Sequence, residues 1–300
     1  MELIVLGAGG FMPDPGFPVP GFVVRHEGVN YLLDAGENSQ TQMAKYGISR
    51  VKFTAVLISH MHGDHTLGLP GVLIRRGQEG GEKPLRLFGP SALQDYVSST
   101  QKYLSYKLHY ETEFVSLSES KSFTLQNLQL TTQPLIHRLE AHGFALQVSR
   151  NKRKFHPEKA RSLEIPEGPL WGELQRGEVV ELEDGRVIKP EQVSDPPPRG
   201  ERLVYITDTR PLEEYPAEFQ EPDLLIHEGM FLEAEREQAE KKFHSTALEA
   251  AQVAQKLNAK RLLLTHFSRR YDDPGVLARE AAKEFTEVGL AKPGMKIEID

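Results

Sequence analysis

The chain has 300 residues, of which 39% are hydrophobic, and a formal net charge of -7 at pH 7. A chain of this length can bury a substantial core, and we expect one α/β domain built from two similar halves. The negative net charge excludes a protein that coats nucleic acid, because phosphate binding requires concentrated positive charge. Any contact with nucleic acid must therefore come from a local basic patch.

The N-terminal residues 1–6 lack the basic region, the long apolar core and the cleavage site that are typical of a signal peptide. No apolar run approaches the roughly 18 residues that span a bilayer. We therefore expect a soluble, cytoplasmic protein with no membrane partner. The chain contains no cysteine, which excludes disulfides and thiolate ligands.

The first half of the chain predicts strands that alternate with helices. Ser91 and Gln94 have the spacing of a capping box, which would begin a helix that runs to Tyr103. A helix of about ten residues is expected after Asn38. The predicted strands are residues 2–6, 22–24, 31–33, 53–58, 85–88 and 128–136.

Residues 150–200 differ from the rest, because apolar periodicity fades there and prolines recur. We expect an inserted flexible arm or a linker, since long irregular insertions in compact domains are usually functional or mobile. The start of this segment holds six basic residues against the single acid Glu158, and the alternative is a solvated charged loop. The basic residues are Arg150, Lys152, Arg153, Lys154, Lys159 and Arg161.

The second half predicts strands at 203–207, 224–226 and 262–265. Thr246 and Glu249 form a second candidate capping box, for a helix that runs to about Asn258. The last helix is expected to start at Asp273 and Pro274 and to end at Gly289.

Five apolar runs finish on a residue type that binds metals, namely His60, His137, Asp208, His227 and His266. Because ligands gather at the carboxyl ends of strands in open α/β sheets, we expect these residues to converge on one site. The remaining isolated histidines are given no role; they are His26, His109, His142 and His156.

The densest cluster is residues 59–65, Ser-His-Met-His-Gly-Asp-His, directly after a predicted buried strand. In extended chain His60 and His62 point the same way, whereas Asp64 and His65 follow the turn at Gly63. This arrangement suits two adjacent metal ions better than one, and the alternative is a His-rich surface loop. Imidazole and carboxylate are the usual zinc ligands where no thiolate is present, so zinc is the leading metal, ahead of manganese or iron.

Two ions about 3.5–4 Å apart require a shared ligand, and a carboxylate can bridge them with its two oxygens. Such a pair activates water near neutral pH and polarises a phosphoryl or acyl oxygen. The expected assignment is His60, His62 and His137 for one zinc ion, Asp64, His65 and His266 for the other, and Asp208 as the bridge.

This pattern resembles the metallo-β-lactamase superfamily and, within it, the ribonuclease Z family. The resemblance spans nearly the whole chain. The segments that carry it are residues 59–65 with Gly68-Leu69-Pro70-Gly71, His137 with Gly143-Phe144, His244-Ser245-Thr246, residues 266–271, and residues 165–169 and 182–186 in the arm. The fold that it implies is two mixed β-sheets flanked by helices (αβ/βα), in the α/β (α+β sandwich) class.

The resemblance also implies an activity, the endonucleolytic removal of the 3′ trailer from precursor tRNA, which leaves a 3′-hydroxyl on the tRNA. It assigns Asp64 as proton acceptor and His244 as general acid, with Glu228 placed to hydrogen-bond His244 and raise its pKa. The arm would grip the tRNA, and in a homodimer it would serve the partner's site. Sequence-independent phosphate contacts would come from Arg150, Lys152, Arg153 and Lys154.

Two other readings of the sequence remain open. The same metal site could act on small phosphodiesters or esters. A non-catalytic, metal-stabilised scaffold that binds RNA or protein is the other possibility, and the presence of every metal ligand together with His244 argues against it.

Overall fold

A computed structural model describes residues 1–14, 16–150 and 152–300, so that Pro15 and Asn151 lie outside the described residues. The chain divides into two compact units. Unit 1 comprises Met1–Gln147 and Glu201–Asp300, and unit 2 comprises Val148–Gly200.

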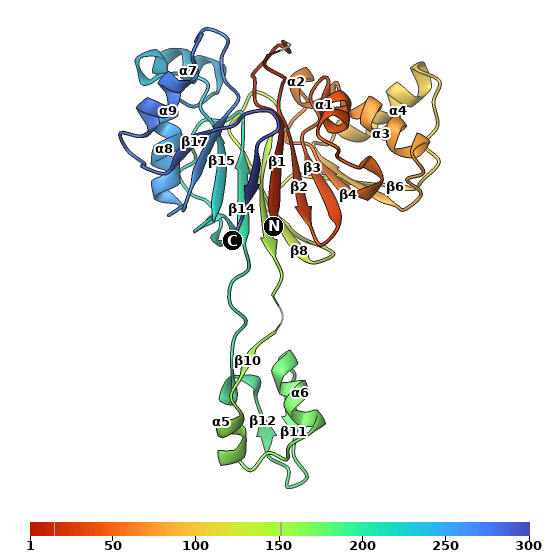
Figure 1. The fold of residues 1–300 in the computed structure, drawn as a ribbon, viewed down its shortest axis with the longest axis vertical. Helices are drawn as coiled ribbons and strands as arrows, with labels where there is room; N and C mark the ends of the chain where they lie inside the picture. Colours follow the sequence, from red (N-terminus) through yellow and green to blue (C-terminus); the bar gives the residue numbers. More distant parts are fainter. Residues whose placement is uncertain (15, 151) are drawn as a thin grey trace. The chain divides into compact units, whose positions relative to one another are not determined.

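The described part of unit 1 contains two seven-stranded mixed sheets (Figure 1). The first sheet has the order β18-β1-β2-β3-β4-β5-β6, and the second has the order β17-β16-β15-β14-β9-β8-β7. The first comprises β1 (Glu2–Gly7), β2 (Gly21–His26), β3 (Val29–Leu33), β4 (Phe53–Leu57), β5 (Leu85–Gly89), β6 (Thr112–Ser116) and β18 (Lys296–Glu298). The second comprises β7 (Ser122–Leu125), β8 (Leu128–Pro134), β9 (His142–Val148), β14 (Arg202–Ile206), β15 (Leu224–Glu228), β16 (Leu262–Thr265) and β17 (Val288–Leu290).

The helices of unit 1 cover the outer faces of the two sheets (Figure 1). Those on the first sheet are α1 (Ser39–Lys45), α3 (Leu69–Gln78) and α4 (Leu93–Tyr103), with the 3₁₀ turn η1 (Arg50–Lys52). The short helix α2 (Gly63–Thr66) lies at the edge of the sheet. The second sheet carries α7 (Arg236–Lys242), α8 (Ala247–Lys256) and α9 (Gly275–Ala281), with η3 (Ala217–Phe219) and η4 (Glu233–Glu235). No helix in the described residues has both the length and the apolar character needed to cross a bilayer.

The inner faces of the two sheets pack against each other through aromatic side chains. The rings of Phe22 and Tyr205 lie 5.5 Å apart, and those of Phe88 and Phe123 lie 5.2 Å apart. The Tyr31 hydroxyl donates to the Leu125 carbonyl across the same interface, at 3.1 Å. This architecture confirms the predicted sandwich of two mixed sheets between helices.

Each sheet is parallel in one part, so several strands end at the same edge of the molecule. Strands β3, β4, β5 and β6 are parallel neighbours in the first sheet, as are β14, β15, β16 and β17 in the second. The edge at which these strands end carries the side chains of the candidate site.

Some of the predicted element ends were wrong, and the structure gives the reason. Ser91 does not cap α4, because its N–H and hydroxyl both donate to Glu140, at 3.1 and 2.8 Å. Helix α9 ends at Ala281, and Gly289 instead pairs with Leu263 in the second sheet. Helix α1 has 7 residues rather than about ten.

The capping box at the start of α8 is confirmed. Thr246 Oγ1 accepts from the Glu249 N–H at 3.1 Å, and Glu249 Oε2 accepts from the Thr246 N–H at 2.9 Å. This box anchors the turn that carries His244, two residues earlier in the chain.

Unit 2 contains regular structure and a small core, although its prolines predicted irregular chain. Pro157 and Pro169 begin its two helices, where a missing N–H costs no hydrogen bond. Its elements are β10 (Lys154–Phe155), α5 (Pro157–Ser162), α6 (Pro169–Arg176), β11 (Val180–Glu181), β12 (Val187–Ile188), η2 (Pro190–Gln192) and β13 (Ser194–Asp195). Its buried core is Ala160, Ile165, Leu174, Val180, Leu182, Ile188 and Val193.

Candidate metal centre

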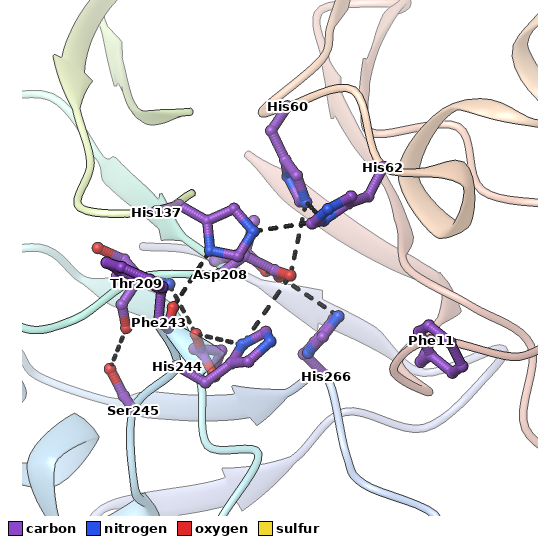
Figure 2. A network of polar contacts seen from close by, with 12 residues as sticks. Phe11, His60, His62, His137, Asp208, Thr209, Phe243, His244, Ser245 and His266 are labelled. Atoms are coloured by element: carbon purple, nitrogen blue, oxygen red, sulfur yellow. Dashed lines mark hydrogen bonds and ion pairs between the residues drawn. The ribbon is translucent and has the colours of Figure 1, made fainter. Parts of the chain in front are cut away.

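Three imidazoles and a carboxylate form the first donor group (Figure 2). His62 Nδ1 lies 3.0 Å from His60 Nε2 and 3.3 Å from His137 Nε2. Asp208 Oδ2 lies 3.5 Å from His60 Nε2. Ligand atoms of a tetrahedral zinc ion are about 3.3 Å apart, given Zn–N distances near 2.0–2.1 Å. The spacing of these four atoms therefore fits a metal ion of this kind.

The second donor group consists of Asp64, His65 and His266. Asp64 Oδ2 lies 3.2 Å from His266 Nε2 and 3.6 Å from His65 Nε2. Among the described residues, His65 Nε2 is a buried atom with no hydrogen-bond partner. A buried polar atom without a partner requires an explanation, and a metal ion at this position provides one.

Asp208 lies between the three imidazoles of the first group and the residues of the second group. Its two oxygens face different partners. Oδ2 faces His60, whereas Oδ1 lies 3.4 Å from His65 Nε2 and 3.3 Å from His266 Nε2. Burial raises the pKa of Asp208, but the adjacent His266, His65 and His60 outweigh burial and lower it well below its ordinary value. The side chain is therefore an anion with one oxygen directed at each donor group.

Burial also sets the charge of the first three imidazoles. It lowers the pKa of His60 and of His137, and it lowers that of His62 to about 4. All three rings are therefore neutral at pH 7, which is the form that binds metals. At His65 burial again lowers the pKa, but the carboxylates of Asp208, Asp34 and Asp64 outweigh it and raise the pKa well above its ordinary value.

Asp34 orients this cluster, and our sequence reasoning gave it no role. Its Oδ2 accepts hydrogen bonds from His65 Nδ1 at 2.7 Å, from the Ser59 hydroxyl at 2.7 Å and from the Tyr205 hydroxyl at 2.6 Å. The Ser59 hydroxyl also lies 3.0 Å from His60 Nδ1. These contacts occupy Nδ1 of both imidazoles, so Nε2 is the nitrogen that faces a metal. Asp34 directly follows a predicted strand, so the strand-end signal that selected Asp208 could also have found it.

His244 lies beside Asp208 and is held by Glu228. Its Nδ1–H donates to the two carboxylate oxygens of Glu228 at 3.0 and 3.2 Å, and Glu228 in turn accepts from the Thr209 N–H at 2.7 Å. Burial lowers the pKa of His244, but Glu228 outweighs it and raises the pKa to about 9. His244 is also near enough to Asp208 and His266 to form a third donor group, but its Nδ1 is already bonded to Glu228.

His227 does not join the site, contrary to the expectation that every strand-end histidine would converge there. Strand β15 continues to Glu228, two residues beyond its predicted end at Ile226. Neighbouring residues of a strand point to opposite faces, so Glu228 reaches His244 while His227 is buried elsewhere.

The cluster opens into a pocket of about 230 Å³. Its polar lining includes His62, Asp64, Asp208, His244 and His266. Exposed apolar side chains stand at its rim, with Phe11 70% and Leu67 57% exposed. The pocket therefore gives a ligand access to both donor groups and to His244.

The four basic residues predicted to bind substrate lie near the start of unit 2, at residues 150–154. Lys152 and Lys154 are exposed. Arg153 is half-buried, and its guanidinium donates to Ser194 and to Glu191 within the same unit. Lys152 and Lys154 are therefore better placed than Arg153 to contact a ligand.

Comparison with known proteins agrees with this geometry. A family model described as Anti-Pycsar protein Apyc1 matches residues 1–158, and one described as a beta-lactamase superfamily domain matches residues 197–267. Two mixed sheets with this cluster of histidines and carboxylates at their shared edge define a metallohydrolase of the metallo-β-lactamase fold.

Relatives that match the chain over its full length identify the family. The ribonuclease Z of Treponema denticola is 33% identical, and that of Myxococcus xanthus is 37% identical; each match covers 100% of this chain and 98% of the relative. The crystal structure of the short form of human tRNase Z superimposes with a TM-score of 0.70 at 26% identity, with 100% of both chains covered. The chain belongs to the ribonuclease Z family, the metal-dependent endoribonucleases of this superfamily.

Asp34→Asn tests the orienting role of this carboxylate. Asparagine keeps the shape of the side chain but removes the charge that holds His65 Nδ1–H and the Ser59 hydroxyl. We expect the affinity for a divalent metal ion, measured with zinc as the probe, to fall roughly 10–100-fold, the usual effect of losing an outer-shell partner. Competition with a chromogenic chelator measures the affinity, and Tyr205→Phe, which removes one donor but no charge, is the matched control. Equal affinities in Asp34→Asn and the unmodified protein would contradict this role.

Proposed function

We propose that this protein is a dinuclear zinc phosphodiesterase that removes the 3′ trailer from precursor tRNA by endonucleolytic cleavage and leaves a 3′-hydroxyl on the tRNA. The observation that carries the proposal is the position of Asp208, with one carboxylate oxygen facing each of two donor groups. Full-length similarity to proteins named ribonuclease Z supports RNA as the substrate class, and the human relative named tRNase Z supports tRNA.

The proposed zinc sites use the donor atoms described above, with His60, His62 and His137 at one, Asp64, His65 and His266 at the other, and Asp208 shared. Neutral imidazole nitrogens and carboxylate oxygens suit zinc in a chain without cysteine. Two ions bound there would supply Lewis-acid polarisation of the phosphoryl group and activation of a water molecule.

Two side chains are proposed to donate and accept the protons of the reaction. His244 is proposed to donate a proton to the 3′-oxygen that leaves, because departure of an alkoxide near pH 7 is difficult without a donor. Glu228 orients His244 through Nδ1, which leaves Nε2 for the substrate. Asp64 is proposed to accept a proton, and the Phe11 N–H holds its Oδ2 at 2.8 Å.

Unit 2 is proposed to be the flexible tRNA-binding arm, inserted within a single metallo-β-lactamase-type domain of residues 1–300. Its basic start, Arg150 to Lys154, would contact phosphates, which position a nucleic acid without reading its sequence. Assembly as a homodimer and a cytoplasmic location complete the proposal, as the family resemblance implies. Sedimentation of the purified protein would test the dimer.

Cleavage of a precursor tRNA tests the proposed function directly. We expect purified protein loaded with zinc to cut a precursor that carries a 3′ trailer just after the unpaired base that follows the acceptor stem. Mapping of the 3′ end of the cleaved tRNA locates the cut and identifies the 3′-hydroxyl. An intact precursor, together with rapid hydrolysis of small phosphodiesters, would favour the alternative substrate class instead.

His244→Ala tests the proton donor. We expect zinc content to be unchanged, because the donor atoms of both groups remain, and kcat on precursor tRNA to fall roughly 10²–10⁴-fold, the usual contribution of a general acid. Steady-state assays at saturating precursor tRNA and elemental analysis provide the two measurements. His109→Ala, at an exposed histidine outside the site, is the control. A kcat that matched the control would remove His244 from the mechanism.

Removal of unit 2 tests the arm. Gln147 and Arg202 are paired in adjacent antiparallel strands, so Asn-Gly can replace residues 148–201 as a two-residue hairpin turn. We expect the shortened protein to lose cleavage of precursor tRNA and to keep hydrolysis of bis(4-nitrophenyl) phosphate. Equal loss of both activities would mean that unit 2 supports folding.

Reversing the charge of one lysine at the start of unit 2 tests whether this unit contacts phosphates, because the rest of the unit is unchanged. Lys152→Glu should weaken binding of precursor tRNA, whereas Lys189→Glu makes the same change of charge outside the basic start of the unit and should not.

A further inference from the structure

Phe11 has an unusual backbone conformation at the rim of the metal pocket. Its φ is 71°, in the left-handed region that bulky side chains rarely adopt, and its side chain is 70% exposed. Such a conformation persists only where the surroundings impose it. Here the Phe11 N–H donates to Asp64 Oδ2 at 2.8 Å, and the preceding Gly10 N–H donates to the Phe267 carbonyl at 3.0 Å.

The backbone thus holds an aromatic ring in solvent next to the proposed reaction site. Figure 2 shows the ring to one side of His266 and apart from the polar network. An exposed aromatic face has little packing value in the folded chain. It can serve as a stacking surface for a nucleobase, whose flat face matches it.

A second pocket, of about 340 Å³, adjoins the metal pocket at Phe11. This size lies within the range of small-ligand sites. The two pockets share Phe11, Arg138, Met230 and His244. The second is also lined by Gly10, Met12, Lys242, Ser268, Arg269 and Arg270.

The lining of this second pocket suits a nucleotide. Phe11, Met12 and Met230 offer apolar surface for a base, and the cations offer contacts for phosphate. Arg269 and Arg270 form ion pairs with Asp14 and Glu235, which tie down the loop that carries them. Arg138 is exposed and forms no ion pair with another residue of the described ranges, so its guanidinium can meet a phosphate.

The position of His244 decides which nucleotide this pocket would receive. His244 lines both pockets, and under the proposed function it protonates the 3′-oxygen that leaves. The nucleoside that carries this oxygen is on the 5′ side of the cut. It must therefore lie on the His244 side of the scissile phosphate, where the second pocket begins.

We infer that the second pocket binds the nucleotide on the 5′ side of the cut, with its base stacked on Phe11 and its own phosphate near Arg138. This inference rests on the proposed function and makes Phe11 a determinant of substrate positioning. Because the contact is with the face of a base, it favours an unpaired nucleotide without reading its identity.

The test combines a protein variant with a substrate variant. Phe11→Asn removes the ring, and asparagine tolerates the left-handed backbone that brings the N–H to Asp64. The two substrates are a precursor tRNA and the same RNA with an abasic residue on the 5′ side of the cut. Phe11→Trp restores an aromatic face. Tyr103→Asn is the matched control, because it removes an aromatic ring that is 77% exposed and lines neither pocket. Zinc content of every variant is measured first.

We expect Phe11→Asn to lower kcat/KM on the normal precursor roughly 5- to 150-fold, the range for loss of one base–aromatic stack, and to have little effect on the abasic one. Phe11→Trp should restore the ratio of kcat/KM on the normal precursor to kcat/KM on the abasic one that the unmodified protein shows. Tyr103→Asn should leave that ratio unchanged. Equal losses by Phe11→Asn on both substrates, or a loss explained by zinc content, would overturn the inference while the proposed function stands. Failure of the unmodified protein to cleave either RNA would overturn both.

Discussion

The structure depends on a buried carboxylate at the edge shared by two sheets. Asp208 is almost inaccessible to water and is surrounded by the imidazoles of His60, His65 and His266. A buried charge is tolerated only when it is paired or coordinates a metal, so these groups must assemble together. The parallel strands bring them together, because their carboxyl ends meet at one edge.

A second carboxylate, Asp34, links this edge to the core. It follows a strand of the first sheet, yet it accepts a hydrogen bond from Tyr205 of the second sheet. Through Ser59 and His65 it also sets which nitrogen of two imidazoles faces the centre. The packing of the two sheets and the orientation of the donor atoms are therefore parts of one hydrogen-bond network, and a change in either alters the other.

Several residues at this edge share a left-handed backbone. Asp34, Asp208, Phe243 and His266 have φ values of 54°, 43°, 59° and 60°, and Phe11 belongs to the same set. The conformation turns the chain sharply after a strand or helix and directs the next groups toward the site. Each such residue costs roughly 1–3 kcal/mol, which the surrounding contacts must offset. Strained residues at these element ends agree with an edge shaped for ligand binding.

The sequence alone determined the donor types and the strands that carry them, because strand ends and ligand chemistry are local properties of the chain. The sandwich fold followed from the resemblance to a known family. Residues 59–65 and Asp208 illustrate this, since each follows an apolar run that is a strand in the structure. Only the tertiary structure decided which strand-end residues meet. His227 points away from the site because β15 extends to Glu228. Asp34 joins the network through a hydrogen bond from Tyr205 of the facing sheet, and Phe11 lies at the rim because its N–H donates to Asp64. The face that a side chain occupies and the partner it meets depend on pairing between distant segments, and no local pattern encodes that.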